Sequence, residues 1–338
     1  MSFTKFEKIE TIVPRVMPEV GPAPYTPGWY EARKSTIGAS EAAAVCGLSR
    51  YAQPLEIYNR KKKDLKPEPQ TKAQRRGHVF EDATLTLYSD RVGGTLLKTT
   101  PMLVHPIWKF MSATPDAIWM PDVLDRDPNL LQVLKLQSIP VDAKTTMHWN
   151  EFGEEGTDDI PQEYVMQAQQ QMAVTGAPRC DLPVLKNMDV SIYSVVRSDD
   201  LIGHIMEAEK EMIERIEKSD PPEPNWEHPK TYDIIRSMYD VTETSKEMSD
   251  ESAGMWLEAS ALSEQKTRLE KAIKLLKAQV LDEMGECAVG NLPNGGQLVR
   301  KTIKREAREV AASEYVRLIF KKERNQPSIH GVIARLLD

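Results

Sequence analysis

Two carboxylates and a lysine stand on neighbouring predicted strands of the 338-residue chain. Asp116 lies in the segment Ser-Ala-Thr-Pro-Asp-Ala-Ile-Trp, whereas Asp142 and Lys144 share the segment Pro-Val-Asp-Ala-Lys-Thr. Because side chains alternate along a strand, Asp142 and Lys144 emerge on the same face. Phosphodiester hydrolysis needs oxygen ligands for a divalent cation and a group that positions or deprotonates the attacking water. The pattern therefore predicts a metal-dependent nuclease centre, with Asp116 and Asp142 as ligands and Lys144 beside the water.

The acid-x-Lys triplet is a weak signal by itself, because it also occurs at 64–66 and 264–266. Only Asp142 follows a mostly apolar run, residues 130–141, as a strand that enters a core requires. The triplet at 64–66 precedes a proline loop, and the one at 264–266 lies inside a heptad helix. Among the Pro-Asp pairs, Asp116 is embedded in an apolar strand pattern, whereas Asp122 lies where that pattern breaks up. Context therefore selects Asp116 and Asp142.

A predicted helix over residues 74–90 carries a further carboxylate. Glu81 shares a helix face with Leu85 and Tyr88, and a carboxylate in an apolar stripe needs a partner. Metal binding and an ion pair with Arg75 or Arg76 explain this position equally well.

A second predicted helix, residues 162–175, begins after Pro161. Tyr164, Gln167 and Gln171 form one stripe of this helix, while apolar residues form another for the core. Amide and phenol groups on one stripe could orient water and phosphate. A plain solvated face is the more common explanation of such a stripe.

Five motifs in order resemble the lambda-type exonucleases, which form the YqaJ branch of the PD-(D/E)xK nucleases. They are Trp29-x3-Arg33-x3-Ile37-Gly38-Ala39-Ser40-Glu41, Gly77-x3-Glu81, Thr114-Pro115-Asp116, Asp142-Ala143-Lys144 and Tyr164-x2-Gln167. Motifs in sequence are far more specific than any one of them. The resemblance implies an α/β, restriction-endonuclease-like core, with a central mixed sheet flanked by helices. It also implies Mg²⁺-dependent digestion of double-stranded DNA from its 5′ ends.

The resemblance also implies roles for individual residues. Glu81, Asp116 and Asp142 resemble the metal carboxylates, and the backbone carbonyl of Ala143 is a further implied ligand. Lys144 resembles the catalytic lysine. The implied glutamine of the later helix is Gln167, with Tyr164 and Gln171 as supporting residues.

A terminal 5′-phosphate would be contacted by Arg33, Ser40 and Thr114, and an arginine fork with hydroxyl groups suits such an anion. One or two Mg²⁺ ions are expected, and Mn²⁺ can substitute. The number stays open, because the family's additional acidic residue has no clear counterpart between residues 96 and 110. The 25-residue separation of Asp116 and Asp142 suggests an insertion around residues 121–129.

Composition limits the remaining classes of protein. Charged residues make up 28% of the chain and the mean hydropathy is −0.47, which favours a soluble protein. No apolar run is long enough to span a membrane and residues 1–14 lack an apolar signal segment, so a cytoplasmic location is expected, in the host if the gene is viral. Three isolated cysteines and six scattered histidines make zinc and disulfides unexpected. The net charge of −7 still allows local basic clusters, such as 33–34, 60–63 and 75–76, to contact phosphates. For 60–63, a solvated helix end is the better explanation.

The chain changes character after residue 197. A helix capped by Asp199 or Asp200 is predicted to reach residue 217, and a proline linker follows at 220–225. Residues 252–283 form a heptad helix, expected to pack as a helical hairpin or short coiled coil. A strand is predicted at 297–304 and a helix at 310–338. We therefore divide the chain into an N-terminal extension (1–24), a nuclease domain (25–218), a linker segment (219–251) and a helical accessory region (252–338).

Several functions fit this pattern. The leading hypothesis is a processive 5′ exonuclease that acts on double-stranded DNA ends and leaves 3′ strands for a single-strand annealing protein, as a homo-oligomer that family resemblance suggests is a trimer. A nicking or structure-specific endonuclease of the same fold is the alternative, and Arg33 and Ser40 favour end recognition over it. A non-catalytic DNA-binding relic is opposed by the intact set of carboxylates and lysine. A structural coiled-coil protein would leave the first 200 residues unexplained.

Overall fold

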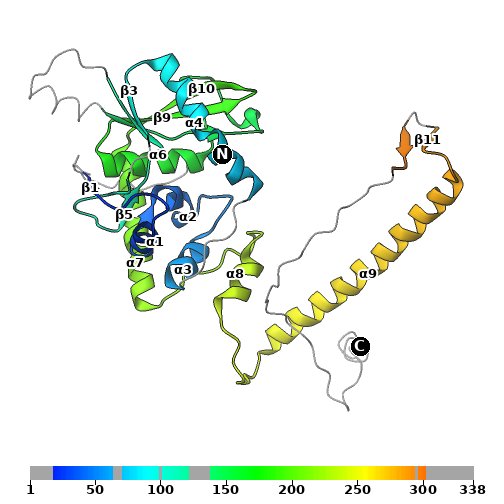
Figure 1. Ribbon diagram of the computed structural model, residues 1–338. Coiled ribbons are helices and arrows are strands. Elements are labelled where there is room, and N and C mark those ends of the chain that lie inside the picture. Colours follow the sequence, from blue (N-terminus) through cyan, green and yellow to red (C-terminus); the bar gives the residue numbers. More distant parts are fainter. Residues whose placement is uncertain (1–17, 64–70, 99–100, 122–137, 294–295, 302–338) are drawn as a thin grey trace, which may run out of the picture. The chain divides into compact units, whose positions relative to one another are not determined.

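The computed structural model describes residues 18–63, 71–98, 101–121, 138–293 and 296–301. The chain forms two compact units, Met1–Met238 and Tyr239–Asp338. Figure 1 shows both units. The predicted insertion around 121–129 and the predicted helix at 310–338 fall largely or wholly outside the described residues.

The first unit contains two mixed β-sheets. A four-stranded sheet has the order β1-β4-β5-β2, and the larger sheet has the order β10-β9-β7-β6-β3, with β8 also paired to β9. Strand β2 runs parallel to β5, and β7 and β8 run parallel to β9, whereas the other pairs are antiparallel. The strands are β1 (Glu19–Val20), β2 (Ile37–Gly38), β3 (Thr95–Lys98), β4 (Leu103–Val104), β5 (Met111–Ala113), β6 (Ala117–Met120), β7 (Ile139–Val141), β8 (Lys144–Thr145), β9 (Arg179–Lys186) and β10 (Asp189–Val196).

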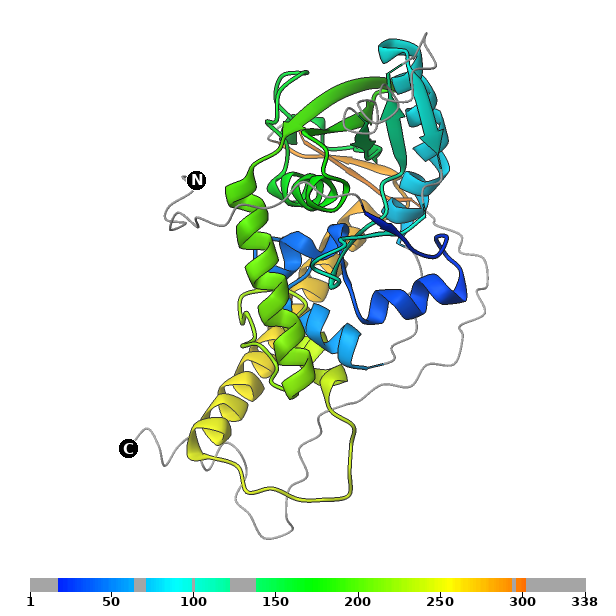
Figure 2. The ribbon, with the colours of Figure 1, turned by 90° about the vertical axis from the view of Figure 1, so that its left-hand side faces the viewer.

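Helices cover these sheets. Helix α4 packs against β8, β9 and β10, whereas α6 packs against β5, β7 and β9 on one side and against α2 and α7 on another. Figures 1 and 2 show α6 between the larger sheet and the helical part, with α7 extending away from the sheet along α2 and α3. The helices are α1 (Pro27–Lys34), α2 (Ala42–Val45), α3 (Pro54–Lys62), α4 (Lys72–Val92), α6 (Gln162–Thr175), α7 (Asp199–Lys218) and α8 (Thr231–Met238), with 3₁₀ turns at Ala39–Glu41 and Trp149–Glu151.

Local sequence signals fix the ends of the helices that carry the site. Helix α4 starts at a capping box, in which Thr71 accepts from the backbone of Gln74 and the Gln74 side chain accepts from the backbone of Thr71. Helix α6 starts after Pro161 and ends at Gly176, whose φ of 73° is in the left-handed region. These helices and the mixed α/β architecture confirm the predictions.

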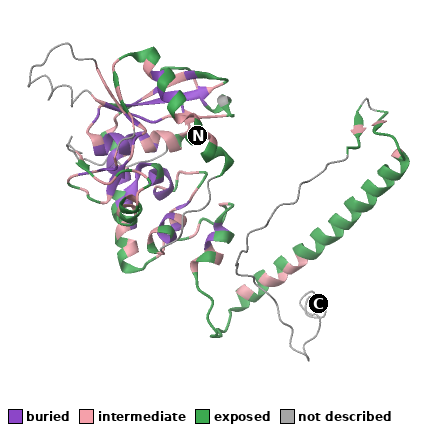
Figure 3. Cartoon of the chain, in the orientation of Figure 1, coloured by how far each residue is buried: buried purple, intermediate pink, exposed green. Residues whose placement is uncertain are grey.

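The core of the first unit lies between its layers. Buried side chains are concentrated on the larger sheet, on α6 and on the helices beneath it, as Figure 3 shows. Met172 of α6, Leu182 of β9 and Tyr193 of β10 are at most 1% exposed and share one apolar cluster. This core holds the strand ends that carry the candidate site.

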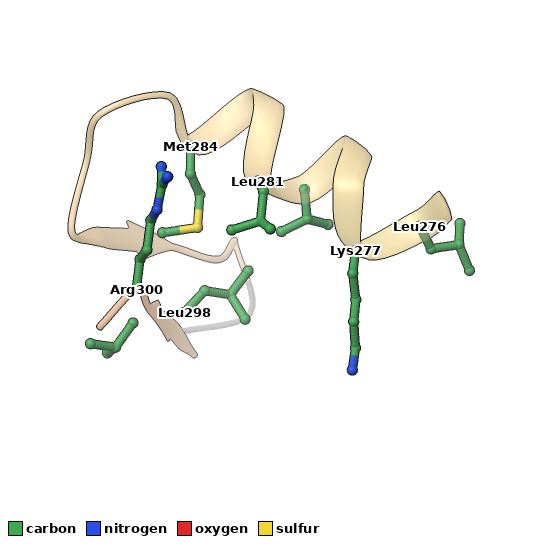
Figure 4. Close-up of a pocket in the computed structure, with 8 residues that line it drawn as sticks. Leu276, Lys277, Leu281, Met284, Leu298 and Arg300 are labelled. Carbon is green, nitrogen blue, oxygen red and sulfur yellow. The ribbon is translucent and has the colours of Figure 1, made fainter. Parts of the chain in front are cut away.

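The second unit consists of α9 (Asp250–Met284), β11 (Val289–Asn291) and β12 (Gln297–Val299). The heptad helix and a strand beginning at Gln297 are confirmed, but no residue of α9 is buried, so its packing as a hairpin or coiled coil stays a prediction. Figure 4 shows the last turns of α9 beside β12, where a cavity of about 400 Å³ is lined mainly by apolar side chains. They include Leu276, Val280, Leu281, Met284, Leu298 and Val299.

Three sequence boundaries differ from the structure. The segment 219–251 is more than a linker, because α8 lies within it and packs against α3, where the Gln53 amide donates to Thr231 Oγ1 at 2.7 Å. Residues 19–20 of the predicted extension form β1, which pairs with β4. Helix α7 is capped by the hydroxyl of Ser198 rather than by Asp199 or Asp200, because Ser198 Oγ accepts from the Leu201 backbone at 3.3 Å.

Candidate active site

The two predicted aspartates meet at one end of the β6–β7 pair. Because Ala117 is paired with Val141, Asp116 just before β6 lies opposite Asp142 just after β7. The backbone N–H of Ala143 donates to Asp116 Oδ2 at 2.8 Å. The Lys144 ammonium forms an ion pair with Asp142 Oδ2. The structure therefore brings Asp116, Asp142 and Lys144 together, as the spacing predicts.

The carboxylates give this partly buried centre an excess of negative charge. Burial, and then the neighbouring Asp142 carboxylate, raise the pKa of Asp116 well above its usual range. Burial of the Lys144 ammonium opposes its charge, but Asp142 and Asp116 outweigh this effect and raise the pKa of Lys144. Two carboxylates thus share one ammonium, and a further cation would relieve their repulsion.

Glu81 lies on α4, on the same helix face as the buried residues Leu85 and Tyr88. Burial raises its pKa, and the charge of Asp142 adds to that rise. His78 Nδ1 lies 3.8 Å from Glu81 Oε2 and forms an ion pair with it when the imidazole is protonated, so the contact differs from the pairing with Arg75 or Arg76 that was the alternative to metal binding.

Asp116 and Asp142 offer the oxygen ligands that Mg²⁺ takes, and the Glu81 carboxylate interacts electrostatically with Asp142 and Lys144. Across the described parts of the chain, however, no three His, Cys, Asp or Glu side chains already form a closed metal cage. Asp116 and Asp142 would be the residues to hold the ion, with Glu81 approaching from α4 and the Ala143 carbonyl as the remaining implied ligand.

Two amides of α6 hold the Asp142 carboxylate in place. Gln167 Nε2 and Gln171 Nε2 donate to Asp142 Oδ1 at 3.0 and 2.9 Å, and Lys144 Nζ donates to Gln167 Oε1 at 3.3 Å. Gln171 is fully buried, so the solvated-face explanation of this stripe is wrong. Tyr164 places its ring 5.2 Å from the Lys144 ammonium. The polar stripe of α6 therefore orients the carboxylate and the lysine together.

A buried aspartate that the sequence analysis did not select supports the same strand. The Asp181 backbone carbonyl accepts from the Asp142 N–H at 3.0 Å, and its carboxylate accepts from Tyr88 Oη and Ser194 Oγ, each at 2.8 Å. Asp181 is only 2% exposed. An available signal was a charged residue within the apolar strand Arg-Cys-Asp-Leu-Pro-Val-Leu-Lys, because a buried charge needs partners.

The three residues predicted to bind phosphate also lie together. Arg33, Ser40 and Thr114 line a cavity of about 50 Å³. The other residues that line it are Gly38, Ala39, Met102, Ser112, Gln167 and Gln171. Gln167 and Gln171 thus border this cavity and also bind Asp142. The cavity and the carboxylate centre are therefore adjacent.

A buried ion pair fixes Arg33 at the edge of this cavity. Glu41 Oε2 accepts from Lys61 Nζ at 2.7 Å, lies 3.3 Å from the Arg33 guanidinium, and accepts from the Gly38 N–H at 3.0 Å. Lys61 also donates to the carbonyl oxygens of Arg33 and Thr36 at 2.8 and 2.7 Å. Burial opposes the charge of Glu41, but Lys61 and Arg33 outweigh it and lower its pKa to about 2. For Lys61, a solvated helix end was therefore the wrong explanation.

Gln170 is another supporting residue that the sequence analysis missed. Its amide donates to the carbonyl oxygens of Ile37 and Ser112, at 2.9 and 3.1 Å, and so ties α6 to β2 and β5 next to the cavity. The contact has no local sequence signal, because its acceptors are backbone groups far away in the chain.

The family model of the YqaJ-like viral recombinase domain matches residues 28–178. The protein YqaJ of Bacillus subtilis (strain 168) is 25% identical over 187 residues, which are 54% of this chain and 54% of that protein. This chain therefore spans about half the length of that curated relative.

Two solved structures show lower similarity. The alkaline exonuclease LHK-Exo of Laribacter hongkongensis is 20% identical, with a TM-score of 0.43, over 58% of this chain and 94% of that chain. A phage-related exonuclease of Haemophilus somnus 129PT is 15% identical, with a TM-score of 0.38, over 54% of this chain and 96% of that chain.

None of the described helices could span a membrane. Residues 28–178, which contain the carboxylates, the lysine and the cavity described above, are the part of the chain that is similar to the YqaJ-like viral recombinase domain.

Proposed function

We propose that this protein is a Mg²⁺-dependent exonuclease that digests double-stranded DNA from its 5′ ends. The family supports action on DNA in recombination. The observation that carries the proposal is the adjacency of the two halves of the site. Gln167 and Gln171 line the cavity of Arg33, Ser40 and Thr114, and the same two amides bind Asp142. An anion held in that cavity would lie next to the carboxylates and the lysine.

The cavity suits a terminal phosphate better than a continuous strand. A guanidinium and two hydroxyl groups match the oxygens of a phosphate monoester. Glu41 and Lys61 fix the guanidinium, so little ordering is needed when the phosphate binds. A DNA end would thereby be positioned with its first phosphodiester toward Asp116 and Asp142.

The chain's own residues would then divide the work of hydrolysis. A bound Mg²⁺ would supply charge neutralisation at the phosphate and activation of water. Asp116, Asp142 and Glu81 would provide oxygen ligands, while Gln167 and Gln171 keep Asp142 oriented. Lys144 would position the attacking water through its ammonium group, because its raised pKa keeps it protonated. Mn²⁺ should substitute, because it accepts the same oxygen ligands.

The same proposal predicts the partner, the oligomeric state and the location of the enzyme. Digestion of one strand from each 5′ end leaves 3′ single strands, which a single-strand annealing protein would bind. A homo-oligomer, a trimer by family resemblance, would enclose DNA and retain it during repeated cleavage. The host cytoplasm is the expected location if the gene is viral.

One experiment tests the polarity and the end requirement together. Linear duplex DNA with 5′-phosphate or 5′-hydroxyl ends and covalently closed circular DNA would each be incubated with Mg²⁺ or with excess EDTA. We expect Mg²⁺-dependent loss of the linear forms only, faster with a 5′-phosphate, and recessed 5′ strands among the intermediates. Nicking of the circle would instead identify an endonuclease. No cleavage of any substrate would overturn the proposed enzymatic function.

A further inference from the structure

Three aromatic side chains lie together at the start of α1. The ring centroids of Tyr25 and Trp29 are 5.5 Å apart, and those of Trp29 and Tyr30 are 5.0 Å apart. Tyr25 is nevertheless 63% exposed and Tyr30 is 42% exposed. The cluster therefore presents aromatic surface to solvent instead of filling the core.

The backbone at Tyr25 is constrained although the side chain is exposed. Its φ of 62° lies in the left-handed region, which aromatic residues rarely adopt. Thr26 fixes the next residue, because its hydroxyl donates to the Ala23 carbonyl at 2.7 Å and accepts from the Trp29 N–H at 3.3 Å. Such strain persists where surrounding contacts impose it, and it is concentrated at functional sites.

The cluster also lies between the two halves of the candidate site. The Arg33 guanidinium, which lines the cavity, sits 4.8 Å from the centre of the Trp29 ring. On its other side, the Tyr25 ring contacts His78, the ion-pair partner of Glu81, edge to face at 5.9 Å. Burial, followed by the charges of Glu81 and Asp116, raises the pKa of Tyr25, which is consistent with this location.

We propose that the exposed ring of Tyr25 is a stacking platform for a nucleobase at the 5′ end of the strand being cut. The proposal rests on the nuclease function above and adds a binding site for the base to the site for the phosphate. A base presents a flat face whatever its sequence, and an aromatic side chain binds that face. Because Tyr25 would compete with the neighbouring base pair, the terminal nucleotide would have to be unstacked from the duplex.

The test compares variants that keep or remove the ring. Tyr25→Phe keeps it, whereas Tyr25→Asn removes it with a residue that tolerates the left-handed conformation. Tyr232→Ala removes an equally exposed tyrosine on α8 and serves as the control. Each variant would be assayed on duplexes whose 5′-phosphorylated terminal nucleotide carries either a normal base or an abasic sugar.

We expect Tyr25→Asn to lower kcat/KM about tenfold on the normal end, mainly through KM, and to have no effect on the abasic end. Tyr25→Phe and Tyr232→Ala should behave like the parent protein on both. Terminal 2-aminopurine should also lose fluorescence on binding the parent protein, in Ca²⁺ without cleavage, but not on binding Tyr25→Asn.

Two outcomes separate this inference from the proposed function. If the parent protein digests DNA but Tyr25→Asn does so equally well on both ends, the platform is wrong and the nuclease stands. An equal loss on normal and abasic ends would also contradict stacking, because it would indicate a role for Tyr25 in holding the protein structure. If the parent protein cleaves nothing, the nuclease function itself is wrong.

Discussion

Helices α6 and α9 depart in opposite ways from the usual rule that apolar side chains are buried and polar ones exposed. In α6, the consecutive glutamines 169–171 are at most 2% exposed. In α9, Leu262, Leu269 and Leu276 are each about 60% exposed, and none of the helix is buried within the described residues. Both helices were predicted from sequence period, so period alone does not determine what a helix face contacts.

The difference shows which interactions stabilise each helix. The glutamines of α6 can be buried because their side-chain amide nitrogens donate hydrogen bonds. The acceptors are the Asp142 carboxylate and the backbone carbonyl oxygens of Val196, Ile37 and Ser112. A buried amide without such partners would be costly. The leucines of α9 have the heptad spacing of a helix interface, which is satisfied only when another surface covers it. Polar burial therefore marks the candidate site in α6, whereas the heptad leucines of α9 are exposed in the single chain.

The largest effect should come from the lysine that α6 orients. Lys144→Ala should lower cleavage about a thousandfold while DNA and Mg²⁺ binding remain, because the carboxylates stay in place. Asp116→Ala should lose Mg²⁺ binding as well. Cleavage rates and calorimetric Mg²⁺ titration would measure both, with Lys98→Ala on the exposed strand β3 as the control. Normal cleavage by Lys144→Ala would show that the centre is misassigned.

The next largest effect should come from the buried pair behind Arg33. Lys61→Met should reduce the free energy of unfolding by about 3 kcal/mol, because it leaves the Glu41 charge with less compensation. Burial opposes the charge of Glu41, but Lys61 and Arg33 lower its pKa to about 2, and the variant would lose the first of these two cations. Chemical denaturation would measure the loss, with Lys62→Met as the control.

The same pair predicts a pH dependence. The pKa of Glu41 is depressed from 4.5 to about 2, so its contribution is complete above pH 4.5 and is lost as the pH falls toward 2. The destabilisation by Lys61→Met should therefore shrink over this interval. A difference that stays constant down to pH 2 would mean that Glu41 is not the group concerned.

A smaller loss of activity should follow from removing one amide on α6. Gln171→Leu should lower cleavage about ten- to a hundredfold, because Asp142 would lose one of the two donors that orient it. Gln279→Leu makes the same chemical change on the exposed surface of α9 and should leave cleavage unchanged. Equal effects of the two substitutions would remove the functional distinction between the helices.

The smallest effect should be that of an exposed leucine. Leu269→Ala on α9 should change the free energy of unfolding by no more than about 0.5 kcal/mol. Met172→Ala on α6 should cost about 2–5 kcal/mol, because Met172 is fully buried. Denaturation at two protein concentrations would measure both. A large loss for Leu269→Ala that grows with protein concentration would show that α9 is buried between copies of the chain.

Much of the site could be predicted because its signals are local. The alternation of a strand places Asp142 and Lys144 on one face, and the helical period places Gln167 and Gln171 one turn apart. Prolines, glycines and capping residues also fixed α4 and α6 to within about two residues. Gln170 and Asp181 were missed, and the pairing of Glu41 with Lys61 was not foreseen, because their partners are distant in sequence or are backbone atoms.

The sequence by itself indicated the resemblance to the YqaJ-like domain, the two aspartates with their lysine, and the helices and strands that carry them. Only the tertiary structure decided that the glutamines of α6 are buried, that Lys61 is paired with Glu41, and that Arg33, Ser40 and Thr114 share a cavity. The physical reason is that periodicity reports which side chains share a face, whereas burial and charge pairing depend on what that face meets after long-range packing.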